Sequence, residues 1–193
     1  MISLPAGAAF VLERLGENGY SAYVVGGCVR DSLLGLAPKD WDVCTSALPE
    51  EMQRAFADQH VIETGLKHGT LTVMHDHQPY EVTTFRVDGA YTDHRHPDEV
   101  RFVTDVVDDL SRRDFTVNAM AWHPQTGLVD AFGGQEDLKA GVIRCVGEPE
   151  KRFGEDALRI MRALRFASVY GFEIEENTAL AVHRMKDTLR NVA

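Results

Sequence analysis

The stretch Ala22-Tyr23-Val24-Val25-Gly26-Gly27-Cys28-Val29-Arg30-Asp31 decides the expected fold class. Ala22 to Val25 is a short apolar run typical of a buried strand, and a helix is expected from Val29 to Leu36. The glycines between them let the backbone approach an anion closely, and the free N–H groups of a first helical turn favour negative charge. The stretch therefore predicts a phosphate-binding turn or, taken alone, an ordinary strand-to-helix turn. Because it matches neither G-x-G-x-x-G nor G-x-x-x-x-G-K-[ST], a dinucleotide fold and a Walker ATPase are disfavoured.

An acidic pair, Asp40-Trp41-Asp42, follows the glycine turn at short range. We expect this pair on a strand, where alternation directs Asp40 and Asp42 to one face and Trp41 to the other. Two adjacent carboxylates repel each other unless a cation joins them, and hard oxygen donors are the ligands that magnesium prefers. A lone D-x-D is a weak signal, since solvated acidic pairs are common. Its combination with the glycine turn predicts a two-metal site for phosphoryl chemistry.

The remaining pattern predicts an α/β fold, with a mixed-sheet head at residues 1–140 and a helical neck at residues 141–193. Residues 75–79 are expected to form a hairpin turn, and the polar residues 86–99 a mobile loop. The expected helices are 4–17, 49–57, 111–121, 153–170 and 178–190, and the expected strands are 22–25, 41–44, 70–74, 80–85 and 127–132.

A basic stripe is expected on the helix that opens near Arg152. Asp156, Arg159, Arg162 and Arg165 recur at every third position, so they share one slowly drifting face, and apolar residues occupy the others. For most helices such a stripe is a solvated charged face. Arginines aligned opposite a metal motif instead suit a triphosphate and RNA phosphates.

Two further features are open on residue type alone. Arg112 and Arg113 place two guanidinium groups at the expected start of a helix, where they suit an anion, or where Ser111 is simply an N-cap with incidental charge beside it. Glu81, within a β-rich run, is either a third carboxylate beside the acidic pair or a solvent-facing strand residue.

The histidine pairs and the cysteines do not indicate a metal site. The pairs His75/His77 and His94/His96 lie in expected loops without acidic or thiol partners at ligand spacing. The three cysteines are far apart and form no C-x-x-C, so we expect buried thiols rather than disulfides or a zinc knuckle.

Composition and charge indicate a globular, cytoplasmic protein. With 44% hydrophobic residues the chain can form a substantial core, yet it has no run of about 18 apolar residues and no secretory signal at its start, so no membrane contact is expected. The net charge of −10 argues against wide contact with a phosphate backbone, although basic residues become more frequent toward the C-terminus.

In order along the chain, these motifs resemble those of the class II tRNA nucleotidyltransferases (CCA-adding enzymes) and their relatives, the bacterial poly(A) polymerases. The similarity covers nearly the whole chain, as its head and neck portion. The matching stretches are Gly26-Gly27-Cys28-Val29-Arg30-Asp31-Ser32-Leu33-Leu34-Gly35 with Asp40-Trp41-Asp42, then Arg112-Arg113-Asp114-Phe115-Thr116-Val117-Asn118-Ala119, then Glu155-Asp156-Ala157-Leu158-Arg159.

The resemblance implies a polymerase-beta-like nucleotidyltransferase head with a mixed sheet, followed by an all-helical neck. It also implies addition of C and A from CTP and ATP to the tRNA 3′ end by two-metal transfer that releases pyrophosphate, with no obligatory protein partner. Body and tail regions, which carry most tRNA contacts in that family, are absent from this sequence. The implied roles are Mg²⁺ binding by Asp40 and Asp42, nucleotide binding by Gly27, Arg30 and Arg113, and base reading by Asp156 and Arg159 with Arg162 and Arg165 nearby.

The implied base-reading pair fits cytosine and adenine chemically. Both bases show an exocyclic amine beside a ring-nitrogen acceptor, which match a carboxylate that only accepts and a guanidinium that only donates. Uracil and guanine show the reverse order and leave buried polar groups unpaired. Three alternatives remain. A poly(A) polymerase and a partial CC- or A-adding enzyme are less favoured because residues 65–70 and 86–99 resemble the CCA-adding branch, and a non-catalytic nucleotide- or RNA-binding module would not need the acidic pair.

Overall fold

A computed structural model describes residues 2–89, 91 and 99–191 of the chain. Its centre is a seven-stranded sheet in the order β3-β4-β5-β2-β1-β8-β9. Neighbouring strands are antiparallel except β2 and β5, which are parallel, so the predicted mixed sheet is confirmed. The strands are β1 (Ala22–Val25), β2 (Val43–Thr45), β3 (His60–Ile62), β4 (Thr70–His75), β5 (Gln78–Thr84), β8 (Ala121–His123) and β9 (Gly127–Val129).

Helices on one face of the sheet bury its apolar side chains. α1 (Ala6–Glu17) packs on β1, β2 and β5, and α3 (Pro49–Ala55) packs on β4. Val11 and Leu15 of α1 and Val24 of β1 are completely buried there, as the helical and strand periodicities predict. The expected helices near the N-terminus and after Ser46, and the expected hairpin at residues 75–79, are therefore confirmed.

The opposite face carries the elements that lead toward the neck. α2 (Gly27–Leu33) follows β1 directly. A small antiparallel pair, β6 (Arg86–Asp88) and β7 (Val100–Phe102), precedes α4 (Val106–Ser111), and short 3₁₀ turns form η1 (Leu66–His68) and η2 (Thr116–Asn118). A second apolar cluster lies under α4, formed by Val25, Cys44, Phe85, Val106, Leu110, Ala119, Ala121 and Val146.

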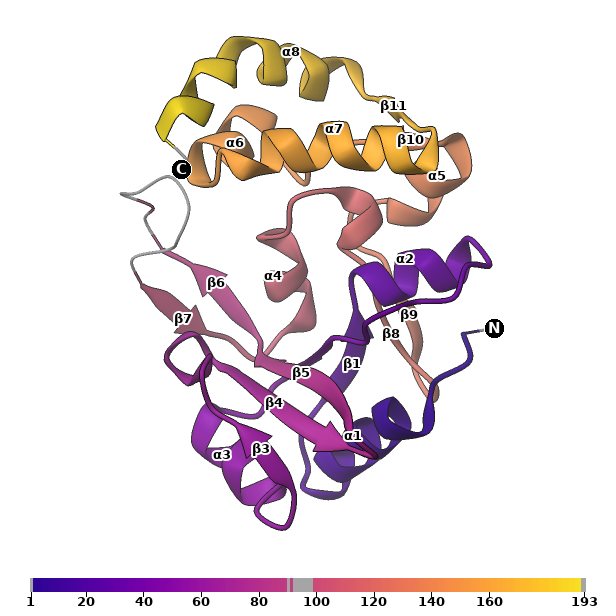
Figure 1. The fold of residues 1–193 in the computed structure, drawn as a ribbon, viewed down its shortest axis with the longest axis vertical. Coiled ribbons are helices and arrows are strands. Elements are labelled where there is room, and N and C mark those ends of the chain that lie inside the picture. The colour runs from indigo at the N-terminus through magenta and orange to yellow at the C-terminus, as the bar shows by residue number, and fades with distance from the viewer. Residues whose placement is uncertain (1, 90, 92–98, 192–193) are drawn as a thin grey trace.

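The rest of the chain is helical apart from one two-stranded parallel pair. Figure 1 shows α6, α7 and α8 together at one end of the molecule, beyond α2 and α4. The core is continuous into this region, because the rings of Phe115 and Phe166 pack edge to face with centroids 5.9 Å apart. These elements are α5 (Gly134–Ala140), β10 (Val142–Ile143), α6 (Pro149–Glu155), α7 (Leu158–Tyr170), β11 (Glu173–Ile174), α8 (Glu176–Met185) and η3 (Lys186–Asn191).

Two expected helices were wrong in extent. The segment 111–121 is not one helix, because α4 ends at Ser111 and the chain continues through η2 into β8. The segment 153–170 is broken at Asp156, whose backbone is extended (φ −141°, ψ 106°) between α6 and α7. The break lets an oxygen of Asp156 accept a hydrogen bond from Leu158 N at 2.9 Å, a local competition with helix that aspartate favours.

Three other expectations also need correction. The acidic pair lies in the extended segment just before β2 rather than within the strand, and β3 was not predicted. Part of the expected loop 86–99 is the β6–β7 pair, while residues 90 and 92–98, including His94 and His96, lie outside the described residues. No helix in the described ranges is long and apolar enough to span a membrane.

Candidate functional site

The glycine turn holds a guanidinium group close to the backbone. Gly26 has φ +78° and ψ −125°, a conformation open to glycine, and its N–H donates to Met120 O at 3.0 Å. A Cβ at Gly26 would lie 2.9 Å from Nη1 of Arg113. The absence of a side chain at Gly26 therefore gives Arg113 its place beside the start of α2.

The acidic pair lies next to this turn, where the chain enters the central strand β2. Val25 N donates to Asp42 O at 3.0 Å, which continues the β1–β2 ladder by one residue. The parallel pairing of Val43 with Val82 places Glu81 opposite Asp42, one step earlier along both strands. Asp40, Asp42 and Glu81 are all exposed. The sheet register thus adds Glu81 to the acidic pair.

Asp42 combines access to solvent with a raised pKa. Surrounding protein desolvates the carboxylate and raises its pKa, the charges of Glu81 and Asp40 raise it further, and Arg113 opposes them. Carboxylates gathered beside Asp42 repel one another until a cation compensates them, so these residues fit a hard divalent ion. Among the described residues, no group of three or more His, Cys, Asp or Glu side chains is already placed to hold a metal.

Arg112 and Arg113 lie at the end of α4, not at the start of a helix. Both face Asp109, which is fully buried, at 2.9 Å and 3.4 Å respectively. Burial alone would raise the pKa of Asp109, but the two arginines outweigh that effect and lower it. Nε of Arg113 is buried and has no hydrogen-bond partner within the part of the chain that the structure describes.

The predicted pattern of exposed arginines and buried apolar residues on this helix is wrong for part of α7. Arg159 is 8% exposed, whereas Met161 and Leu164 are 51% and 46% exposed. Arg159 donates to Glu155 Oε2 at 2.6 Å and to Arg112 O at 3.2 Å, so its guanidinium is held against the head. The ion pair with Glu155 stabilises the buried Arg159, while the apolar side chains of Met161 and Leu164 remain in solvent against the usual preference.

Arg162 and Arg165 lie further along α7. Arg162 Nε donates to Asp114 Oδ2 at 2.7 Å, and the Arg165 guanidinium lies 5.5 Å from the Phe166 ring centroid. Arg30 is buried, and its Nη2 is 3.5 Å from the position of a Cβ on Gly27.

The candidate residues form two groups that meet on one segment, residues 112–114. Arg113 lies beside the glycine turn and contributes to the electrostatics of Asp42. Arg159 and Arg162 reach the carbonyl of Arg112 and the carboxylate of Asp114. Segment 112–114 therefore contacts both the glycine turn and α7.

Several residues that organise the site were not singled out from the sequence. Glu155 accepts from both Arg152 and Arg159, at 2.8 Å and 2.6 Å. Asn118 Nδ2 donates to Asp114 Oδ1 at 3.1 Å. Glu155, Asn118 and Asp114 stand inside the quoted motifs, and their partners lie only three or four positions away, so the structure rather than the residue types revealed these bonds.

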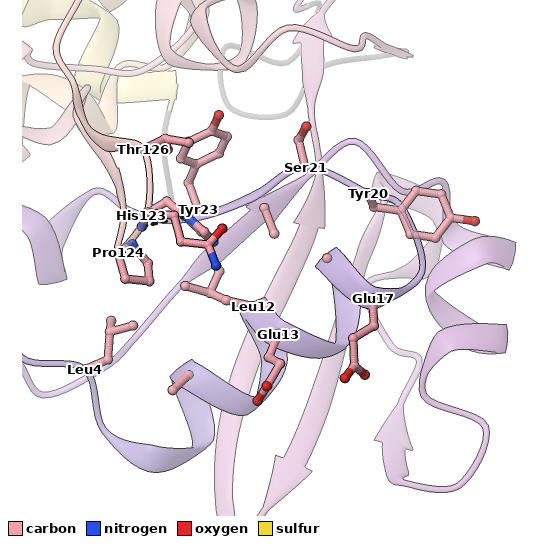
Figure 2. A pocket seen from close by; sticks show the side chains of 14 residues that line it. Leu4, Leu12, Glu13, Glu17, Tyr20, Ser21, Tyr23, His123, Pro124 and Thr126 are labelled. Carbon is pink, nitrogen blue, oxygen red and sulfur yellow. Dashed lines mark hydrogen bonds between the residues drawn. The ribbon is translucent and has the colours of Figure 1, made fainter.

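A cavity of about 660 Å³ lies away from these residues (Figure 2). It is bounded by α1, β1 and the β8–β9 turn, and Tyr23 packs edge-on against His123 there with ring centroids 6.0 Å apart. Glu13 and Glu17 also line it. None of the candidate site residues lines this cavity, and its acidic side chains do not suit a phosphate.

Comparison with known proteins finds related chains and a matching family. The model of the "Poly A polymerase head domain" matches residues 22–144. A CCA-adding enzyme of Oceanobacillus iheyensis is 50% identical over 194 residues, covering 100% of this chain and 48% of that protein. A CCA-adding enzyme of Geobacillus kaustophilus is 51% identical over 172 residues, covering 89% of this chain and 42% of that protein.

Solved structures agree as well. The Bacillus stearothermophilus CCA-adding enzyme in complex with CTP has a TM-score of 0.88 and 45% identity, covering 96% of this chain and 44% of that one. The Thermotoga maritima CCA-adding enzyme complexed with tRNA_CCA has a TM-score of 0.73 and 30% identity, covering 92% and 40%. The chain spans about half the length of the curated relatives it matches. With the sheet, the glycine turn and the acidic pair in place, the chain belongs to the poly A polymerase head domain family.

Proposed function

We propose that this chain is the head and neck portion of an enzyme that adds C and A nucleotides from CTP and ATP to the 3′ end of tRNA. The observation that carries the proposal is the convergence of Asp42, Arg113 and the Gly26 turn where the chain enters β2, with α7 docked on the adjacent segment. Relatives about 50% identical over nearly the whole chain are CCA-adding enzymes, which supports this reaction over other nucleotidyl transfers.

Within this proposal, residues 1–140 form the catalytic head and residues 141–193 the neck. Nucleotidyltransferases of this family depend on a divalent cation, and we assign magnesium to Asp40 and Asp42, whose hard oxygens suit it. When bound, the cation polarises the α-phosphate and neutralises the pyrophosphate that leaves. Glu81, opposite Asp42, is placed to share the cation or to accept the proton of the tRNA 3′-hydroxyl.

The nucleotide is held by backbone and guanidinium groups. Gly27 lets the triphosphate approach the chain closely, and Arg113 supplies positive charge beside the Gly26 turn. Arg162 and Arg165 extend the positive surface along α7, where it can meet phosphate oxygens. Arg30, behind Gly27, contributes positive charge to the same turn.

Asp156 and Arg159 read the base in this proposal. Leu158 N–H occupies one oxygen of Asp156, which fixes the carboxylate and leaves the second oxygen to accept from an exocyclic amine. Glu155 and the carbonyl of Arg112 fix the Arg159 guanidinium before a nucleotide arrives. A preorganised acceptor and donor select cytosine and adenine over uracil and guanine because the latter leave groups unpaired.

The test is incorporation of single nucleotides into tRNA that lacks its 3′ end, by the full protein that carries this chain. We expect CTP to be incorporated first and one ATP afterwards, with no reaction from Asp42→Ala although its melting temperature is not lowered. Long adenosine tails would instead support a poly(A) polymerase, the alternative that the name of the family model raises. Binding of CTP and ATP without incorporation would support a non-catalytic module.

The compartment belongs to the proposal too. The three cysteines are unpaired and buried, as is usual for thiols in a reducing compartment. We assign the protein to the cytoplasm, where its tRNA substrate is available.

A further inference from the structure

An arginine of the head packs against two aromatic rings of the neck, whose centroids lie 6.2 Å apart. The guanidinium carbon of Arg30, on α2, is 5.1 Å from the ring centroid of Phe166 and 4.8 Å from that of Tyr170, both on α7. The Arg30 side chain is only 8% exposed, so these contacts take place with little competing water. Cation–π contacts strengthen when they are desolvated.

The same arginine is part of a chain of hydrogen bonds that begins on α7. Tyr170 Oη donates to Asp31 Oδ1 at 2.9 Å, and Arg30 Nε donates to the same oxygen at 2.8 Å. Arg30 Nη1 then donates to Asn118 Oδ1 at 2.5 Å. Burial raises the pKa of Tyr170, so its hydroxyl is a neutral donor at physiological pH.

From Asn118 the hydrogen bonds continue through Asp114 to Arg162 and so return to α7. Asn118 Nδ2 donates to Asp114 Oδ1 at 3.1 Å, and Asp114 Oδ2 accepts from Arg162 Nε at 2.7 Å. We call this closed circuit, from Tyr170 through Asp31, Arg30, Asn118 and Asp114 to Arg162, the α7 clamp.

The clamp holds α7 at two separate points. Arg162 and Tyr170 are eight positions apart, which corresponds to roughly 12 Å along a helix. A helix held at two points that far apart cannot pivot about either one. Because Arg159 lies on the same helix, one turn before Arg162, the clamp fixes where its guanidinium points.

We propose that Tyr170 is a positioning residue for nucleotide selection, which acts through the α7 clamp on Arg159. This inference rests on the proposed function for its catalytic consequence. Tyr170 contacts Asp31 and Arg30 and is not itself one of the residues assigned to the nucleotide, so it acts on the site through its neighbours. Arg30 is the poorer test residue, because its Nη2 also backs Gly27 and a substitution there would disturb the glycine turn directly.

Two variants separate the hydroxyl from the ring. Tyr170→Phe removes the bond to Asp31 and keeps the ring over Arg30, whereas Tyr170→Leu removes both. We expect discrimination of CTP over UTP to fall on the order of fivefold in the first variant and further in the second, because a bond to a charged group is lost. KM for CTP should rise more than kcat falls. Tyr20→Phe, which removes a phenolic hydroxyl far from α7, is the matched control and should change neither value.

A distance measurement tests the clamp without any reaction. The native cysteines are buried, so spin labels attach selectively to Glu13→Cys on α1 and Ser168→Cys on α7, both exposed positions. Tyr170→Leu should broaden the distribution of distances between the labels. An unchanged distribution overturns the clamp, and a broadened distribution with unchanged discrimination overturns its link to selection. If the unsubstituted protein incorporates neither CTP nor ATP, the proposed function fails and the label distances decide the clamp alone.

Discussion

Replacing Gly26 with alanine tests the glycine turn and the placement of Arg113 together. The backbone of Gly26 has φ +78° and ψ −125°, which an L-residue rarely adopts. The new Cβ would also lie 2.9 Å from Arg113 Nη1, closer than such contacts occur. Because Asp109 holds the other side of that guanidinium, Arg113 must leave its place beside the turn or the turn must open.

The backbone strain alone should cost about 1–3 kcal/mol. For a domain of this size each kcal/mol lowers the melting temperature by about 2–4 °C, so a decrease of roughly 2–12 °C is expected. Displacement of Arg113 removes a charge-assisted contact to the triphosphate, worth about 1.5–3 kcal/mol, and KM for CTP and ATP should rise by roughly ten- to a hundredfold.

Thermal unfolding and steady-state incorporation measure the two effects separately. Gly19→Ala is the matched control, because Gly19 also has a positive φ, +85°, but no atom lies within 4 Å of its Cβ position. It should lose stability and keep its KM values. If Gly26→Ala loses stability but binds CTP and ATP as the unsubstituted protein does, the role assigned to Arg113 is refuted.

Three further predictions concern charge and thiols. Asp42→Asn should abolish incorporation yet stabilise the metal-free protein at neutral pH, because the pKa of Asp42 in the folded protein is raised above its ordinary value and its ionised carboxylate therefore costs stability as pH rises. In urea unfolding, the stability advantage of the variant should vanish below about pH 4, where the carboxyl group is protonated in both the folded and the unfolded protein. Equal stability of the two proteins at pH 7 would count against crowding of carboxylates around Asp42. Arg159→Ala should lower the preference for CTP and ATP over UTP and GTP by roughly 5- to 160-fold in competition assays, because the penalty of about 1–3 kcal/mol for leaving a buried polar group unpaired would be lost. Arg184→Ala removes an exposed ion pair on α8 and should leave this preference unchanged. Burial raises the pKa of Cys28 to about 11 and of Cys145 to about 12. A disulfide reagent at pH 8 should therefore modify these thiols slowly in the folded protein and quickly in urea. Fast labelling of the folded protein would contradict their burial.

Local sequence patterns were sufficient for the parts of the molecule that depend on neighbours in the chain. The strand, glycine pair and helix at residues 22–33, the hairpin at 70–84 and α1 follow from periodicity and turn chemistry. The acidic pair was found because its two residues are adjacent. The strand itself was misplaced by a small margin, since it begins at Val43, two residues later than the predicted start at Trp41.

The helix break at Asp156 shows why local patterns were not enough in the neck. The apolar and charged spacing of residues 153–170 is compatible with one continuous helix. At the end of α6 the Asp156 side chain bonds to the backbone two residues later, and Arg159 bonds to Glu155 of α6 and to the carbonyl of Arg112 in the head. Such contacts compete with helix formation but leave no trace in its periodicity.

By itself, the sequence determined which chemical groups are available: a flexible turn, two apposed carboxylates and a row of arginines. The tertiary structure alone decided which of them meet. Glu81 joins Asp42 only through the parallel register of β2 and β5, and Tyr170 reaches Asp31 across 139 positions of the chain. The physical reason is that hydrogen bonds and charges act over a few ångströms of space, whereas periodicity reports only on residues within a few positions of one another.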